Sequence, residues 1–229
     1  LSLGLKLDFS IVQKLRHDRL QLEAFLLGMA GLLDTPGKSD SYTRQLQSAF
    51  QYLRIKFSLN RTGILNPDFL RLRPSNFPTI RLSQLSVLMA TQPRLFGKLM
   101  YTYKRPELHK LLSAAASDYW ETHYTFGNPS KRKSKKLSPA FMDLLIINSV
   151  VPLQFVHARA KGRDIWQPLR ALMESCPPER NYILNNLSEI GMRATNALQS
   201  QALKQNYDHH CMKNRCLECA IGSYLLKGI

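Results

Sequence analysis

The chain has 229 residues, of which 44% are hydrophobic, so it is long and apolar enough to fold around a packed core. Its 32 Lys and Arg residues against 16 Asp and Glu residues give a formal net charge of +16. Such a field attracts polyanions, so nucleic acid or another polyanion is one candidate partner. The alternatives are a basic surface that serves solubility and a basic portion whose compensating acidic segment lies in the missing part of the protein. The longest apolar stretch, around residues 144–155, is interrupted by Asn148 and Pro152, so we expect no membrane span.

The ends of the sequence and its cysteines bear on where the protein works. It opens without Met and inside a structured pattern, so we expect the C-terminal portion of a longer protein whose N-terminal portion is missing. No signal peptide is visible. Three of the four cysteines crowd the last residues, unlike the disulfide framework of a secreted domain. We therefore expect a cytoplasmic protein.

An apolar stripe at helical spacing predicts a buried helix over residues 11–33. Glu23 lies within this stripe, and the small residues Gly28, Ala30 and Gly31 allow another helix to approach closely. A carboxylate in such a place needs a cationic partner. We interpret Glu23 either as a general base or arginine anchor, or as one half of a structural salt bridge.

The most distinctive segment is residues 71–85, RLRPSNFPTIRLSQL, which we call the arginine loop. Its two prolines fix their own φ angles and keep the preceding residues out of α geometry, so the loop has a defined backbone. Guanidinium groups match phosphate oxygens in shape and charge. The predicted phosphate-binding residues are Arg71, Arg73, Asn76, Arg81 and Gln84.

The remaining pattern is helical, with no convincing β alternation and no internal repeat. Further helices are predicted over residues 41–59, 83–89, 107–119, 140–151, 165–173 and 195–207, with another starting near residue 179. Residues 140–151 are apolar almost all round, which predicts a central helix containing a buried Asn148, with the arginine loop against it. We expect one all-α domain over residues 1–229, an irregular bundle of roughly eight to ten helices with a Cys-rich C-terminal tail.

Two further segments carry candidate groups. His123 lies in YWETHYTFG, residues 119–127, either as an acid–base group or as a hydrogen-bonded core histidine. Residues 128–136, NPSKRKSKK, are a basic loop suited to a polyanion, although such charge runs are also simply solvated.

The C-terminal tail suggests a metal site. Its cysteines, Cys211, Cys216 and Cys219, are spaced so that their thiolates can converge on one ion. A zinc site would need His209, His210 or Cys176 as fourth ligand, and an iron–sulfur cluster would need Cys176. The alternative is that these cysteines pack as small hydrophobic residues.

Six segments together resemble a bacterial family known only as domain of unknown function 2851. They are LEAFLLGMAGLL at residues 22–33, RLRPSNFPTIRLSQL, YWETHYTFG, INSVVP at residues 147–152, SQAL at residues 200–203 and CMKNRCLECAIG at residues 211–222. The family's members are longer, so the resemblance also implies a C-terminal portion. It implies no activity, and His209 and Cys176 fall outside the matching segments.

Three functions fit these observations, and whether the protein is an enzyme stays open. The leading hypothesis is a basic module that binds nucleic acid or phosphate within a nucleic-acid-processing protein. The second is a hydrolase acting on a phosphorylated or nucleic-acid substrate, with Glu23 and His123 as acid–base groups. The third is a structural scaffold whose arginines are buried in salt bridges to Glu23, Asp68 or Glu107. Exposure of the arginines distinguishes the first from the third, because a phosphate must be able to reach them.

Overall fold

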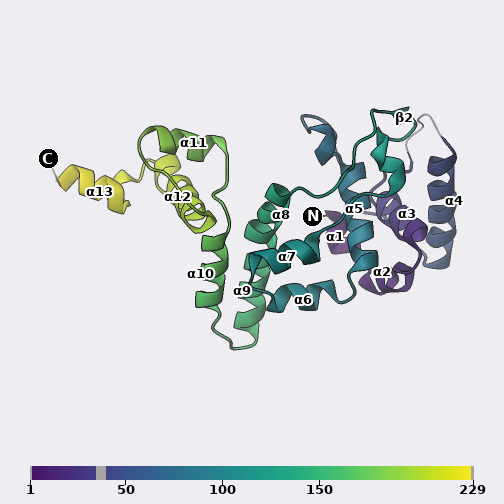
Figure 1. Ribbon diagram of the computed structural model, residues 1–229, viewed down its shortest axis with the longest axis horizontal. Helices are drawn as coiled ribbons and strands as arrows, with labels where there is room; N and C mark the ends of the chain where they lie inside the picture. The colour runs from purple at the N-terminus through teal and green to yellow at the C-terminus, as the bar shows by residue number, and fades with distance from the viewer. Residues whose placement is uncertain (1, 35–39, 228–229) are drawn as a thin grey trace. The chain divides into compact units, whose positions relative to one another are not determined.

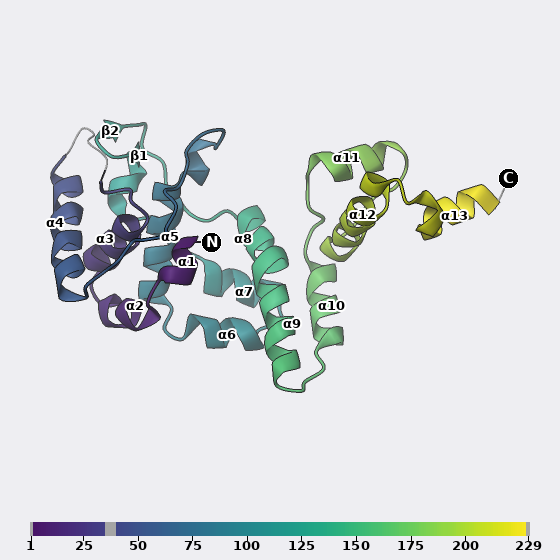
Figure 2. The same cartoon turned by 180° about the vertical axis from the view of Figure 1, so that it is seen from behind.

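A computed structural model describes residues 2–34 and 40–227. It is predominantly helical with a single small antiparallel hairpin in the described part, which confirms the all-α fold class. Two compact units form, and each is described on its own (Figures 1 and 2). Unit 1 comprises Leu1–Leu95 and Leu111–Ser138, and unit 2 comprises Phe96–Lys110 and Pro139–Ile229. The expectation of one domain over residues 1–229 stays a prediction.

Unit 1 is built around one buried helix. Its helices are α1 (Ser2–Lys6), α2 (Phe9–Leu15), α3 (Arg19–Met29), α4 (Ser41–Lys56) and α5 (Pro78–Thr91), followed by the hairpin β1 (His123–Thr125) and β2 (Asn128–Pro129). Helix α3 packs against both α4 and α5 (Figure 1). Every residue of α3 from Leu22 to Met29 is buried, so this helix forms the centre of the unit 1 core.

The predicted helix over residues 11–33 is divided in two. Asp18 interrupts it, because its carboxylate accepts a hydrogen bond from the backbone N–H of Gln21 at 3.0 Å and so caps α3. The close helix approach expected beside Gly28 is confirmed. A Cβ atom at Gly28 would lie 2.3 Å from ring atoms of Phe50 on α4, so only glycine leaves room for that ring.

Unit 2 contains the remaining helices. They are α6 (Leu95–Tyr101), whose first residue belongs to unit 1, α7 (Arg105–Leu112), whose last two residues do so, α8 (Pro139–Leu145), α9 (Val151–Ala160), α10 (Trp166–Ser175), α11 (Tyr182–Glu189), α12 (Ala197–His209) and α13 (Ala220–Lys227). A π-helical turn, Ile146–Val150, joins α8 to α9. Helix α10 packs against α9 and α12. The described residues thus hold helices α1 to α13 rather than eight to ten, because many are short.

The helix predicted over residues 140–151 differs from expectation in two ways. Helices α8 and α9 and the turn between them run on as one helix, Pro139–Ala160, although Pro152 lies inside it and lacks an N–H group. Proline is accommodated there just after the π-helical turn Ile146–Val150, where the helical hydrogen-bond pattern changes. Asn148 is exposed rather than buried, and it lies in the π-helical turn, where helical periodicity no longer predicts which face a residue occupies. Its amide donates to the carbonyl of Leu144 at 3.2 Å and to Glu179 Oε1 at 2.9 Å.

The same helix bears on the membrane question. Pro139–Ala160 has 22 residues and is long and apolar enough to cross a bilayer by length and composition. One such helix is weak evidence for a span, because core helices of soluble proteins have the same composition. The expectation of no membrane partner stays a prediction, as does the contact between this helix and the arginine loop, which belong to different units.

Several other helices begin at a proline or directly after a short polar residue. Helix α4 begins at Ser41, as predicted, and Asp40 caps it by accepting a 2.8 Å hydrogen bond from the N–H of Thr43. Helix α5 starts at Pro78 instead of near residue 83, because proline is well suited to a first helical turn. Helix α7 ends at Leu112 rather than near residue 119, and a short 3-10 helix, Asp118–Glu121, then leads into the hairpin.

Candidate functional site

The arginine loop has a defined backbone, as its prolines predicted. Arg71 adopts a left-handed conformation with φ of 61°, and Pro74–Asn76 form a 3-10 turn whose last N–H bonds the carbonyl of Arg73 at 2.7 Å. The side chains of Arg71 and Arg73 are exposed. Within the described residues neither forms an ion pair, so both guanidinium groups face solvent.

Three of the predicted phosphate-binding residues lie together. Arg81 donates from Nη1 to Gln84 Oε1 at 2.9 Å and from Nη2 to Asn76 Oδ1 at 2.6 Å. Desolvation lowers the pKa of this half-buried guanidinium group. Gln84 is buried and donates its own amide hydrogen to the carbonyl of Lys135 at 2.8 Å. Gln84 therefore orients Arg81 from inside the protein, while Asn76 is exposed beside it.

Arg81 also borders a hollow of about 460 Å³ on unit 1. Ser2 and Asn66 supply the other polar side chains of its lining, which is otherwise formed by apolar residues and prolines. An anionic group entering this hollow would meet one cation and two hydrogen-bonding side chains.

The basic loop is anchored at one buried lysine. Lys135 Nζ donates to the backbone carbonyls of Glu121 and Lys133, each at 3.1 Å, and lies 4.0 Å from the ring centroid of Tyr124. Arg132 forms an ion pair with Glu121 at 2.7 Å. The exposed cations of the loop that form no ion pair within the described chain are Lys131, Lys133 and Lys136. The loop therefore presents lysines from a fixed base.

Glu23 is held by neutral groups, and the expectation of a cationic partner was wrong. Its side chain accepts hydrogen bonds from Trp120 Nε1 at 2.6 Å and from the Ser117 hydroxyl at 3.2 Å. Ser117 in turn lies 3.1 Å from the hydroxyl of Tyr42, whose pKa is raised by burial and by the nearby Glu23 carboxylate. Both neutral donors bind the same oxygen, Oε1, and the indole N–H of the fully buried Trp120 reaches it directly.

His123 belongs to an aromatic stack. Its ring lies parallel to Tyr119 with centroids 4.1 Å apart, and its Nδ1 is 3.0 Å from the Tyr119 carbonyl. Tyr119 donates its hydroxyl to Asp40 Oδ2 at 2.6 Å, and burial together with this bond raises the pKa of Tyr119 to about 12. In the described residues no hydrogen bond joins His123 to Glu23. These contacts favour the structural interpretations of both residues, and the acid–base assignment stays untested.

The cysteines of the C-terminal tail do not form a ligand cluster in the described chain. Cys211 and Cys216 are exposed, whereas Cys219 is buried and lies 3.4 Å from Asn206 Oδ1. Over residues 2–34 and 40–227 no three His, Cys, Asp or Glu side chains are arranged to hold a metal ion. Burial raises the pKa of the Cys176 thiol to about 11. Zinc and iron–sulfur binding thus stay sequence-based predictions.

Unit 2 contains a charged cluster that the sequence did not predict. Asp143 is 4% exposed and accepts from Arg105 Nε at 2.7 Å and Nη2 at 2.9 Å, and it lies 2.7 Å from His109 Nε2. Burial raises the pKa of Asp143, but the bonds from Arg105 and His109 outweigh it and the net pKa is lowered. Arg105 and His109 are four residues apart on α7, which places them on one helix face, a signal that sequence analysis could have used.

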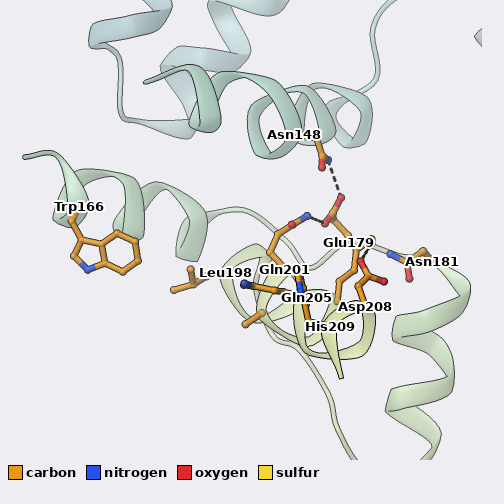
Figure 3. Close-up of a pocket in the computed structure, with 11 residues that line it drawn as sticks. Asn148, Trp166, Glu179, Asn181, Leu198, Gln201, Gln205, Asp208 and His209 are labelled. Carbon is orange, nitrogen blue, oxygen red and sulfur yellow. Dashed lines mark hydrogen bonds and ion pairs between the residues drawn. The ribbon is translucent and has the colours of Figure 1, made fainter. Parts of the chain in front are cut away.

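A polar cleft of about 720 Å³ lies in unit 2 (Figure 3). At its centre Glu179 accepts hydrogen bonds from Asn148 and from Gln201 of α12, and its backbone N–H donates to Ser200 at 3.2 Å. The indole ring of Trp166 lines the cleft at a site away from Glu179 (Figure 3). The Glu179 carboxylate is thus fixed with lone pairs to spare, so it can accept a hydrogen bond from a hydroxyl or ammonium group.

Comparison with known proteins adds a family but no activity. The model of a family described as protein of unknown function (DUF2851) matches residues 1–182. No curated protein and no solved structure matches the chain. The match covers the arginine loop, the basic loop and the Asp143 cluster, and it stops before α12 and the cysteine tail.

Proposed function

Since the chain belongs to the DUF2851 family, whose function is unknown, we propose from its own geometry that it is a basic nucleic-acid-binding module. In this proposal the arginine loop contacts the phosphate backbone. The basic loop, residues 128–136, adds diffuse attraction. The module would act in a cytoplasmic, nucleic-acid-processing protein.

One observation carries the proposal. Arg71 and Arg73 are exposed, without an ion pair in the described chain, on a loop whose backbone is fixed by a 3-10 turn and by Pro78. Holding two long cationic side chains near each other without a carboxylate is unfavourable, and a phosphate chain removes that cost. A bidentate guanidinium–phosphate contact also gives the geometry that a freely moving lysine lacks.

The scaffold alternative is less consistent with the contacts. It required the arginines to be buried against Glu23, Asp68 or Glu107. Instead Glu23 is bound by Trp120 and Ser117, Asp68 accepts from the backbone of Leu70 at 2.8 Å, and Glu107 lies 3.6 Å from Lys104. These three carboxylates are therefore engaged elsewhere, while Arg71 and Arg73 remain accessible.

The test is a fluorescence-anisotropy titration of labelled duplex DNA at several salt concentrations. We expect Arg71→Ala/Arg73→Ala to lose about tenfold or more in affinity at near-physiological salt. The slope of log K against log salt should also fall by about two, because two phosphate contacts disappear.

The matched control is Arg19→Ala/Arg54→Ala, which removes the same charge from two exposed sites elsewhere on unit 1. It should shift affinity only slightly, through the net charge. Equal losses in the two double variants would show nonspecific attraction and contradict a phosphate site on the arginine loop. Absence of binding at low salt would contradict the whole proposal.

A further inference from the structure

A second basic surface lies in unit 2, on residues that the arginine loop does not use. We call it the aromatic–basic patch and define it by Phe96, Tyr101, His157, Lys161 and Arg163. Phe96 and Tyr101 come from α6, His157 from α9, and the two cations from the connection that follows α9. The patch therefore joins α6 to a distant segment of the chain, namely α9 and the turn that directly follows it.

The two aromatic rings are largely open to solvent. Phe96 is 58% exposed and Tyr101 is 52% exposed, which is unusual for large apolar side chains on neighbouring turns of one helix. His157 lies between them and meets each ring edge-on, with centroids 5.9 Å from Phe96 and 5.7 Å from Tyr101. The His157 ring therefore contacts both aromatic residues, and each of them keeps more than half of its surface accessible to a ligand.

Two cations, Lys161 and Arg163, lie next to Tyr101. Arg163 Cζ lies 4.8 Å from the ring centroid, and Lys161 Nζ lies 3.2 Å from the Tyr101 hydroxyl. Within the described chain neither cation forms an ion pair. The Nε and Nη2 atoms of Arg163 are buried and have no acceptor among the described residues. Buried donors of this kind normally have partners. The half-buried guanidinium group therefore carries a positive charge that is unpaired over the part of the chain that the structure describes, and an anionic group beside it would balance this charge.

A buried residue, Gln154, fixes the backbone that carries the patch. Gln154 of α9 is fully buried, and its amide donates to the carbonyls of Leu99 at 2.6 Å and Thr102 at 2.8 Å. These bonds join the C-terminal end of α6 to α9 and so fix the backbone on either side of Tyr101. A surface fixed in advance loses little conformational entropy on binding.

We propose that the aromatic–basic patch binds single-stranded nucleic acid, with bases stacked on Phe96 and Tyr101 and phosphates bound by Lys161 and Arg163. Exposed aromatic rings interleaved with cations suit a strand whose bases are unpaired, since every base has a π face and every nucleotide a phosphate. In a duplex the bases stack on each other and cannot reach the rings. This inference rests on the proposed function for its class of ligand, but not on the arginine loop.

The experiment compares a labelled oligothymidylate strand with a duplex of equal length, by anisotropy, on the full chain. We expect Phe96→Ala/Tyr101→Ala to weaken binding of the single strand by about tenfold or more per ring and to leave duplex binding within about twofold. Phe96→Ala alone removes one exposed ring and leaves Tyr101 with its cations. The logarithm of its loss in single-strand affinity should be about half of that of the double variant. A strand containing 2-aminopurine should be quenched by the wild type and less so by both variants.

The control is Phe155→Ala/Arg159→Ala. Arg159 Cζ lies 5.7 Å from the Phe155 ring centroid, so this pair is also an exposed aromatic residue with a cation on α9. Phe155 is two residues from His157 and hence on the opposite side of the helix. Equal losses from the control and from the patch variant would overturn the inference, as would equal losses for strand and duplex.

The results also separate this inference from the proposed function. Binding that depends on Arg71 and Arg73 but not on Phe96 and Tyr101 would overturn the inference alone. Single-strand binding that needs the two rings but is indifferent to those arginines would support the patch and contradict the arginine loop as the binding site. No binding to either nucleic acid would overturn both.

Discussion

Two buried carboxylates show how the two units of this protein solve the same physical problem differently. Glu23 in unit 1 is 2% exposed and is held by the neutral indole of Trp120 and the hydroxyl of Ser117. Asp143 in unit 2 is 4% exposed and is held by the cation Arg105 and by His109. A carboxylate can be buried with either set of partners, provided that its oxygens are hydrogen-bonded.

The difference has a consequence for what each unit presents to solvent. In unit 1 the buried Glu23 carboxylate is bound by an indole and a hydroxyl group, and Arg71 and Arg73 of the arginine loop remain exposed. In unit 2 Arg105 forms a bidentate hydrogen-bonded contact with the buried carboxylate of Asp143. A basic composition therefore does not tell which cations are available to a ligand, because that depends on where the few carboxylates lie.

The largest effect is expected at Asp143. Asp143→Ala should destabilise unit 2 by about 3–5 kcal/mol, since it leaves the guanidinium of Arg105 without its buried partner. Urea denaturation followed by circular dichroism and by the fluorescence of Trp166 measures the change. Glu107→Ala on the same helix α7 is the control, because its contact with Lys104 is exposed and should be worth less than about 0.5 kcal/mol. Similar losses for both variants would show that Asp143 is not a structural charge centre.

A somewhat smaller effect is expected at Glu23. Glu23→Ala should cost about 3 kcal/mol, because it leaves the indole N–H of Trp120 and the hydroxyl of Ser117 unpaired in the core. Glu23→Gln keeps a carbonyl oxygen for the same donors and should cost about 1 kcal/mol. The emission of Trp120 during denaturation measures both. A Glu23→Gln variant as damaged as Glu23→Ala would indicate that the negative charge itself is required.

The smallest effect should appear in the dependence of stability on pH. The pKa of Asp143 is lowered in the folded state below its ordinary value of 3.8, so its carboxylate stabilises the protein fully above that value. This contribution is lost as the pH falls from 3.8 through the lower folded-state pKa. Asp143→Asn should therefore flatten the acid limb of the unfolding free energy measured by urea titration between about pH 5 and pH 2. An acid limb as steep as that of the wild type would contradict this role.

Local sequence features determined much of the helical structure. Proline and short polar residues fixed helix starts, as Asp40 does for α4 and Pro106 within the first turn of α7, because these preferences arise from neighbouring backbone atoms. The spacing of Gly28 within an apolar stripe also predicted the close approach of another helix. The rigid backbone of the arginine loop followed from its prolines in the same way.

Tertiary structure alone decided the partners of the charged groups. The sequence shows Glu23 and Trp120 as residues 97 positions apart, and no local rule brings an indole N–H to that carboxylate. Likewise Asn148 is exposed within a π-helical turn that the helical pattern did not predict, and Glu179 is hydrogen-bonded by Gln201 when α12 folds back against it. Helical periodicity and proline geometry depend on a few consecutive residues, whereas burial and ion pairing depend on which distant segments pack together. The sequence by itself therefore determined a basic all-α protein with an arginine-rich segment of defined backbone, and the tertiary structure decided that Arg71 and Arg73 of this segment are exposed to a ligand.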